Sequence, residues 1–179
     1  MDAQIYLEEH LLWESRGNVA GMGNSTSSKK NMVAIRKRQK HLLLKELPGS
    51  CPSSSDEKKR LLGQGLYELG DFREAANAWL IIEEKTAQDL ALIGVVFLYL
   101  EEWDQAVLHL QASLQLEELG YSYYWLALAQ KKNVEDYQLE AEEKASILDL
   151  LRKACALPAC PAEAFLWLDN LVRRAENDD

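Results

Sequence analysis

The pattern of hydrophobic and polar residues between positions 61 and 110 repeats after 31 positions. The segment LLGQGLYELGDFREAANAW (61–79) matches LIGVVFLYLEEWDQAVLHL (92–110) in size and polarity at six positions, all in one register. In both copies the hydrophobic residues of the first half lie one and four positions apart, which is the spacing of one helix face. A short polar turn follows, at Gly70-Asp71 or Glu101-Glu102, before a second apolar run. This repetition predicts two helix–turn–helix hairpins.

Small residues recur at the same places in both copies. Gly63 and Gly94 lie inside the first helix of each hairpin, and Ala75 and Ala106 lie in the second. Glycine inside a helix costs about 1 kcal/mol relative to alanine, so its recurrence predicts a point where two main chains approach closely. The aromatic residue after each turn, such as Trp103, is expected to pack back over its hairpin.

A third, less regular hairpin follows the first two. The run Tyr123–Ala129 predicts its first helix, with Ala127 in the place of the two glycines, and Ile147–Ala154 predicts its second. The polar stretch 131–144 is longer than the other turns and predicts extended helix ends or a protruding loop.

After two prolines, residues 162–174 predict a last helix that caps the open end of the stack. We expect one face of it to dock on the third hairpin and the opposite face to lie in water. The docking face consists of Phe165, Leu168, Leu171 and Val172, and the polar face of Asp169, Arg173 and Arg174.

The order of a small residue in a first helix, a short turn, an aromatic, then an alanine and a bulky residue in a second helix resembles the tetratricopeptide repeat. The resemblance implies an all-α fold of antiparallel helix hairpins stacked as a short solenoid. It implies repeats at about 56–86 and 87–118, a degenerate one at 120–157 and a cap at 161–175. The family repeat has about 34 residues, and we expect the shorter interval here to arise in the turn around Glu83 to Gln88.

The resemblance also implies a concave partner-binding groove lined by the first helices. Carried over position by position, this groove is unusually apolar and aromatic. It comprises Arg60, Gln64, Tyr67, Leu92, Val95, Leu98, Tyr99, Tyr124, Trp125 and Leu128, with Leu61 and Lys131 beside them. Three interpretations stay open: a groove for an apolar peptide, a surface covered by the N-terminal segment or a sister chain, or misassigned core.

The two-carboxylate clamp of this family, which holds the acidic tails of heat-shock chaperones, is not expected here. Such a clamp needs Lys or Arg and Asn on the first helices, because cations and amides bind carboxylates. The corresponding positions carry Arg60, Gln64, Leu92, Tyr121 and Trp125, a set with a single cation.

The first third of the chain differs from the predicted repeat domain at 56–179. Residues 1–55 form an arm in which Gln4–Trp13 and 31–47 predict helices and 15–28 is a linker rich in Gly and Ser. Segment 29–45 holds seven Lys or Arg and no acid, whereas 46–179 holds 12 basic and 25 acidic residues. The basic segment fits a nuclear-import pattern or a phosphate-binding helix, or else a solvated face that rests on the acidic body.

Catalytic and metal-binding patterns have little support. His10, His41 and His109 are isolated, and Cys155 with Cys160 forms at most half of a metal site that has no second half. There is no glycine-rich phosphate loop and no nucleophile elbow. We therefore expect no enzymatic activity, no cofactor and no metal.

Composition favours a cytoplasmic protein, with the nucleus as the other possibility. No apolar run approaches the roughly 18 residues that a membrane span needs, and the N-terminus carries acids where a secretory signal carries bases. The three cysteines, an odd number, suit a reducing compartment.

The leading hypothesis for function is a non-enzymatic adaptor or assembly subunit that binds a segment of another protein, with self-association through the arm as a further possibility. One alternative is a dedicated chaperone for an assembly or secretion substrate, because the arm, three repeats and cap resemble the layout of small helical-repeat chaperones. A second alternative is a nucleic-acid-linked factor acting through segment 29–45. Its affinity would fall steeply with salt.

Overall fold

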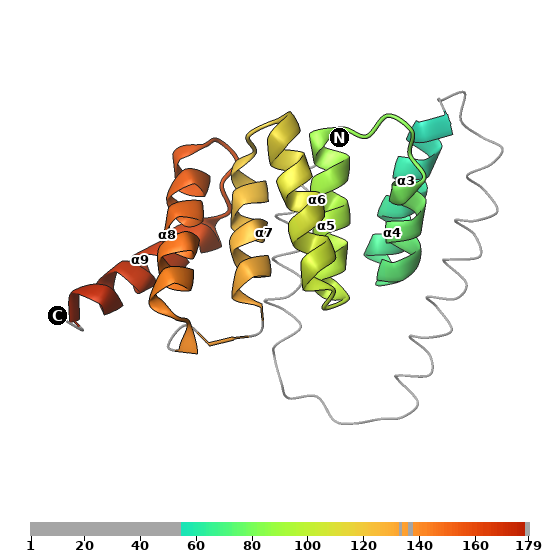
Figure 1. Ribbon diagram of the computed structural model, residues 1–179. Coiled ribbons are helices and arrows are strands. Elements are labelled where there is room, and N and C mark those ends of the chain that lie inside the picture. Colours follow the sequence, from blue (N-terminus) through green and yellow to red (C-terminus); the bar gives the residue numbers. More distant parts are fainter. Residues whose placement is uncertain (1–54, 133, 136–137, 178–179) are drawn as a thin grey trace, which may run out of the picture. The chain divides into compact units, whose positions relative to one another are not determined.

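The structure is a computed structural model that describes residues 55–132, 134–135 and 138–177 (Figure 1). Within these ranges the regular elements are α-helices and no strand occurs, which confirms the all-α fold class. They are α3 (Ser55–Glu68), α4 (Phe72–Leu80), α5 (Ala87–Tyr99), α6 (Trp103–Leu116), α7 (Gly120–Lys131), α8 (Ala141–Ala156) and α9 (Ala162–Asn177). The predicted arm helices at Gln4–Trp13 and 31–47, and the basic segment, lie outside the described residues.

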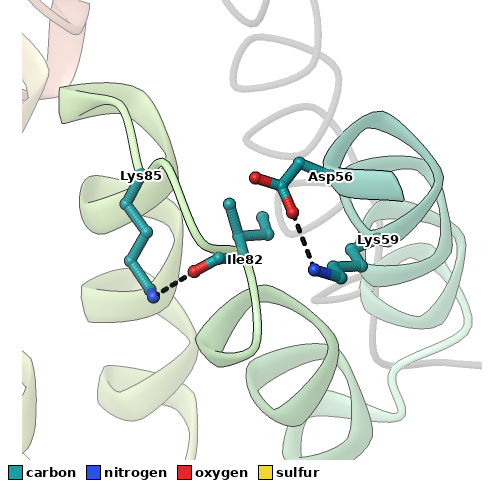
Figure 2. A network of polar contacts seen from close by, with 4 residues as sticks. All are labelled: Asp56, Lys59, Ile82 and Lys85. Carbon is teal, nitrogen blue, oxygen red and sulfur yellow. Dashed lines mark hydrogen bonds and ion pairs between the residues drawn. The ribbon is translucent and has the colours of Figure 1, made fainter. Parts of the chain in front are cut away.

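The chain divides between Ala78 and Trp79 into two compact units, and each is described by itself. The described part of the first unit consists of α3 and most of α4. Helix α3 begins with two acidic residues, which suit the positive end of the helix dipole. The side chain of Lys59 reaches back one turn to Asp56, with Nζ 2.7 Å from Oδ1 (Figure 2). On α3, Gly63 is buried, and on α4 its matching small residue Ala75 is fully buried.

The two predicted hairpin turns close in the same way, 31 residues apart. In each turn the second residue after the helix is in the left-handed region, Gly70 at φ 78° and Glu101 at φ 59°. Each turn also has two backbone hydrogen bonds that satisfy the last carbonyls of its first helix. The donors and acceptors are Asp71 to Leu66 (2.9 Å) and Gly70 to Tyr67 (2.9 Å), then Glu102 to Phe97 (2.9 Å) and Glu101 to Leu98 (3.0 Å). This shared geometry confirms the repeat at the level of the backbone.

The aromatic residue after the first turn packs as the sequence predicts. The rings of Phe72 and Tyr67 lie 5.6 Å apart across the turn, tilted by 57°. Trp103, at the corresponding place in the second hairpin, is half-buried.

The shortening of the first repeat lies in its second helix, not in the following turn. Helix α4 has 9 residues, whereas the corresponding α6 has 14. The connection from α4 to α5 spans residues 81–86 and is longer than the connection 117–119 from α6 to α7. The expectation of a shortened turn around Glu83 to Gln88 is therefore wrong. The connection is not shortened because it carries polar contacts of its own.

Two sets of contacts build that connection. Lys85 Nζ donates a hydrogen bond to the carbonyl of Ile82 at 2.6 Å (Figure 2). Thr86 then caps α5 through a reciprocal capping box, in which its hydroxyl accepts from the backbone N–H of Asp89 and the Asp89 carboxylate accepts from the backbone N–H of Thr86.

Gly94 sits where α5 and α6 nearly touch, which confirms the prediction for this glycine. A Cβ atom added to Gly94 would lie 2.6 Å from Cγ of Leu110 and 3.2 Å from the carbonyl oxygen of Ala106, both on α6. Ala106 and Leu110 are fully buried, so the second hairpin closes around a contact that admits no side chain at this position.

A buried pair of hydroxyl groups ties α6 to its two neighbours. Ser113 Oγ donates to the carbonyl of Ala87 at 2.8 Å and lies 3.1 Å from Oγ of Ser122 on α7. Both serines are fully buried. Because a buried hydroxyl without a partner costs about 1–3 kcal/mol, this network favours one register between the second and third hairpins.

The third hairpin and the last helix form where the sequence predicts them. Helices α7 and α8 contain the two predicted runs, and α8 begins at Ala141, so the end of the polar stretch 131–144 is helical. The N-terminus of α7 is close to the α8–α9 connection: a Cβ on Gly120 would lie 3.0 Å from the carbonyl oxygen of Pro158 and 3.1 Å from that of Ala154.

The register of α9 differs in part from the predicted one. Leu171 is buried and Leu168 and Val172 are half-buried, as expected for the docking face, but Phe165 is 51% exposed. Ala164 is fully buried in its place. The docking stripe therefore includes the small side chain of Ala164 in place of the ring of Phe165.

Candidate functional site

The first helices of the second unit, α5 and α7, contact each other, and α6 packs against both. Gly94 and Ala127 hold equivalent places on α5 and α7, so Val95 corresponds to Leu128 and Leu98 to Lys131. Leu98 follows Val95 by three residues and therefore shares its helix face. By this register we expect Leu98 and Leu128 on one side of the α5–α7 pair, and this side is called the candidate face.

Seven of the ten predicted groove residues are half-buried, which leaves part of each side chain open to a partner. In the first unit these are Arg60, Gln64 and Tyr67 on α3, and in the second unit Leu92, Leu98 and Tyr99 on α5 and Leu128 on α7. The two sets belong to separate units, and only the second set lies on helices whose contact the structure describes.

The exposure expected for Val95, Tyr124 and Trp125 is not found. Their side chains are 2%, 7% and 8% exposed, respectively. Helical periodicity identifies a face of a helix but does not indicate what covers that face. Here the ring of Tyr124 is in contact with Trp167 of the last helix.

An aromatic cluster joins α7 to α9. The ring of Tyr124 meets Trp125 edge-on, with centroids 5.3 Å apart, and meets Trp167 of α9 at 6.4 Å and 86°. Lys131 Nζ lies over the Trp167 ring, 5.2 Å from its centroid, in a cation–π arrangement. Trp167, which is half-buried, was not among the predicted site residues, although the sequence shows a tryptophan flanked by Leu166 and Leu168 at this place.

The cluster, and Tyr121 in the first turn of α7, contain polar atoms that are buried without a partner among the described residues. The indole nitrogens of Trp125 and Trp167 and the hydroxyl of Tyr121 have no hydrogen-bond partner among the described residues. Burial, with a smaller contribution from Glu117, raises the pKa of Tyr121 to about 12, so its hydroxyl keeps its proton at neutral pH. All three groups are thus donors.

The one histidine in the described residues lies between α6 and α5 rather than on the candidate face. The imidazole of His109 stacks on Phe97 with ring centroids 5.4 Å apart and planes 7° apart. Burial lowers the pKa of His109, and the nearby ammonium of Lys85 lowers it further. Within the residues that the structure describes, no three or more His, Cys, Asp or Glu side chains gather as metal ligands would.

Stacked helix hairpins whose first helices lie side by side define this part of the chain as a helical-repeat fold of the tetratricopeptide-like class. The sequence matches no protein-family model and no curated protein. Among solved structures it is similar to MamA, a tetratricopeptide-like protein, in a form comprising residues 41 to the end from Desulfovibrio magneticus RS-1. That match has 19% identity and a TM-score of 0.59 and covers 87% of this chain and 88% of that one.

Two further MamA structures match in the same way. The RS-1 ArsTM double mutant of MamA has 18% identity and a TM-score of 0.58, with 87% of each chain covered. Another crystal structure of MamA has 15% identity and a TM-score of 0.55, covering 88% of this chain and 98% of that one. At such identities the likeness shows the fold. As for membranes, every helix described here is too short or too polar to cross a bilayer.

Proposed function

We propose that this chain is a non-enzymatic scaffold or adaptor that binds a segment of another protein along α5 and α7. The proposal is supported by half-buried leucines on two first helices that contact each other, Leu98 on α5 and Leu128 on α7, which the repeat register assigns to one face. The likeness to the fold of MamA supports a helical-repeat scaffold and leaves the partner open.

The chemistry of this face suits an apolar partner segment. Leucine side chains that are already half-buried lose little freedom on binding, and the rigid ring of Tyr99 at the end of α5 is a typical interface anchor. The nearest cation on α7, Lys131, is engaged with the Trp167 ring. An extended or helical segment with spaced apolar side chains fits this face better than an acidic tail.

A pair of matched leucine substitutions tests the proposal. Leu98→Glu puts a charge on the candidate face, and Leu108→Glu puts the same charge on α6 at a side chain that is 57% exposed. In pull-downs with the full-length chain, Leu98→Glu should lose the co-purifying protein and Leu108→Glu should retain it. Circular dichroism and thermal melting of both variants verify that each is folded.

Two results of this experiment would contradict the proposal. Retention of the partner by a folded Leu98→Glu variant would remove the α5 face from the interaction. Loss of the partner only in Leu108→Glu would move the interaction to the second helices. Purifying the captured partner alone then separates two roles, because a client of a dedicated chaperone aggregates without it, whereas a partner of an adaptor stays soluble.

A further inference from the structure

Two cysteines meet where α8 ends. Cys155 lies in the last turn of α8, and Cys160 lies in the connection just before α9. The thiol of Cys160 points at the sulfur of Cys155, with 3.7 Å between the two Sγ atoms, and also at the carbonyl oxygen of Pro161 at 3.5 Å. Both cysteines are free and half-buried.

The backbone between the cysteines is shaped so that the chain turns back on itself. Ala159 has φ 59°, a left-handed conformation that residues other than glycine rarely adopt. The N–H of Leu157 donates to the carbonyl of Ala154 at 3.2 Å and closes the last turn of α8. The fold of the connection therefore brings the two Sγ atoms to 3.7 Å, and a disulfide bond of about 2.0 Å requires them to move closer.

We propose that Cys155 and Cys160 are a redox pair, and that an oxidised low-molecular-weight disulfide converts them into an intramolecular disulfide that fastens the start of α9 to the end of α8. The sulfur contact carries this proposal, and it is independent of what the α5–α7 face binds.

The exchange is balanced with an oxidised thiol compound RSSR as the oxidant. The thiolate of one cysteine attacks a sulfur of RSSR, which breaks its S–S bond, releases RS⁻ and leaves a mixed disulfide. The released RS⁻ takes the proton of the second cysteine's thiol, and the resulting thiolate attacks the first cysteine's sulfur, which expels the second RS⁻. The two cysteines are oxidised by two electrons, and RSSR is reduced to two RSH after protonation.

The structure also indicates which cysteine reacts first. Burial raises the pKa of Cys160 to about 12, with further contributions from the contact with Cys155 and from the charge of Glu163. A thiol with such a pKa stays protonated in neutral buffer and is a poor first nucleophile. The first attack therefore falls to Cys155, and Cys160 completes the exchange from its position beside the mixed disulfide.

The consequence of the link is local to the junction of three helices. The connection that carries Cys160 lies against the N-terminus of α7: a Cβ on Gly120 would be 3.0 Å from the carbonyl oxygen of Pro158 and 3.4 Å from the backbone nitrogen of Cys160. Helix α9 in turn places Trp167 against Tyr124 of α7. Oxidation should therefore hold α9 in place, while reduction leaves it free to open locally.

The test uses the full chain with Cys51→Ser, so that only the pair reacts. The protein is incubated with glutathione disulfide and digested with trypsin, which cuts after Lys153 and Arg173. The peptide 154–173 should lose the mass of two hydrogens, and the protein should lose two titratable thiols. Each matched control keeps one thiol of the pair: Cys160→Ser, which keeps Cys155, should stop at the mixed disulfide, and Cys155→Ser, which keeps Cys160, should stay mostly unmodified.

Two outcomes would overturn the proposal. If both cysteines of the pair each carry glutathione, or if chains link to one another instead, the pair does not form the internal bond. Hydrogen exchange of α9 amides provides the second readout, and slower exchange is expected after oxidation of the pair but not in either single variant. Unchanged exchange after complete conversion would rule out the fastening of α9.

Discussion

Gly94→Ala places one methyl group into the contact between α5 and α6, and the structure allows its cost to be worked out. The new Cβ would lie 2.6 Å from Cγ and 3.1 Å from Cδ2 of Leu110, whereas ordinary contacts begin at 3.4 Å. Leu110 is fully buried, and the third neighbour, the carbonyl oxygen of Ala106, is main chain. The helices must therefore move apart.

Two opposing contributions set the expected magnitude. Overpacking of a core costs about 1–3 kcal/mol, and alanine is better than glycine in a helix by about 1 kcal/mol. We expect Gly94→Ala to lower the free energy of unfolding by about 1 kcal/mol, and the larger Gly94→Leu by about 3 kcal/mol. Urea denaturation followed by circular dichroism measures both.

The contribution of helix propensity, alanine relative to glycine, is measured separately at Gln111, an exposed position in the middle of α6. Gln111→Ala should be more stable than Gln111→Gly by about 1 kcal/mol. The clash is measured by combining Gly94→Ala with Leu110→Ala, which removes the atoms nearest to the new methyl group. In that background Gly94→Ala should be neutral or stabilising, with a coupling of about 1–3 kcal/mol.

One result would refute this reasoning. If Gly94→Ala in the otherwise natural chain stabilises the protein as much as alanine does over glycine at Gln111, the helices do not approach closely at Gly94.

The double variant is measured in trimethylamine N-oxide, because Leu110→Ala alone costs about 2–5 kcal/mol and the osmolyte strengthens the folded state.

The remaining predictions concern the turns and the histidine. Glu101 has a left-handed backbone like Gly70, so Glu101→Gly should raise the free energy of unfolding by up to about 1 kcal/mol. Gly70→Ala should lower it by about as much. If urea denaturation shows no change in either variant, the left-handed backbone is not strained at these positions. His109 has a lowered pKa, so the unfolded chain binds its proton more readily and stability falls as the pH drops below the ordinary value of 6.5. His109→Gln should flatten the pH dependence of the melting temperature between about pH 7 and pH 5. If the natural chain and His109→Gln have the same pH profile, the imidazole is not buried as described.

The turns and hairpin order were predictable because they depend on residues that are close in the sequence. The sequence marks the two turns at Gly70-Asp71 and Glu101-Glu102, and the structure adds that Gly70 and Glu101 are left-handed. The close contact at Gly94 was predictable for a similar reason, since a glycine that recurs in a helix despite its cost indicates a steric requirement.

The candidate face was predictable only in part. Leu98 and Leu128 remain half-buried on the expected helices, but Val95, Tyr124 and Trp125 are buried. A helix period places residues on a face to within about one position, and it does not distinguish a face that meets a partner from one that meets another helix of the same chain.

The sequence by itself determined the helices, their pairing into hairpins, the two equivalent turns and the place of the Gly94 contact. Only the tertiary structure decided that Trp167 lies on Tyr124, that Phe165 points away from the docking stripe, and that Cys155 and Cys160 face each other. Turn and helix formation depend on neighbours within a few residues, whereas these contacts depend on how α9 is rotated and bent back after α8. That geometry arises from packing between segments distant in the sequence, on which local periodicity carries no information.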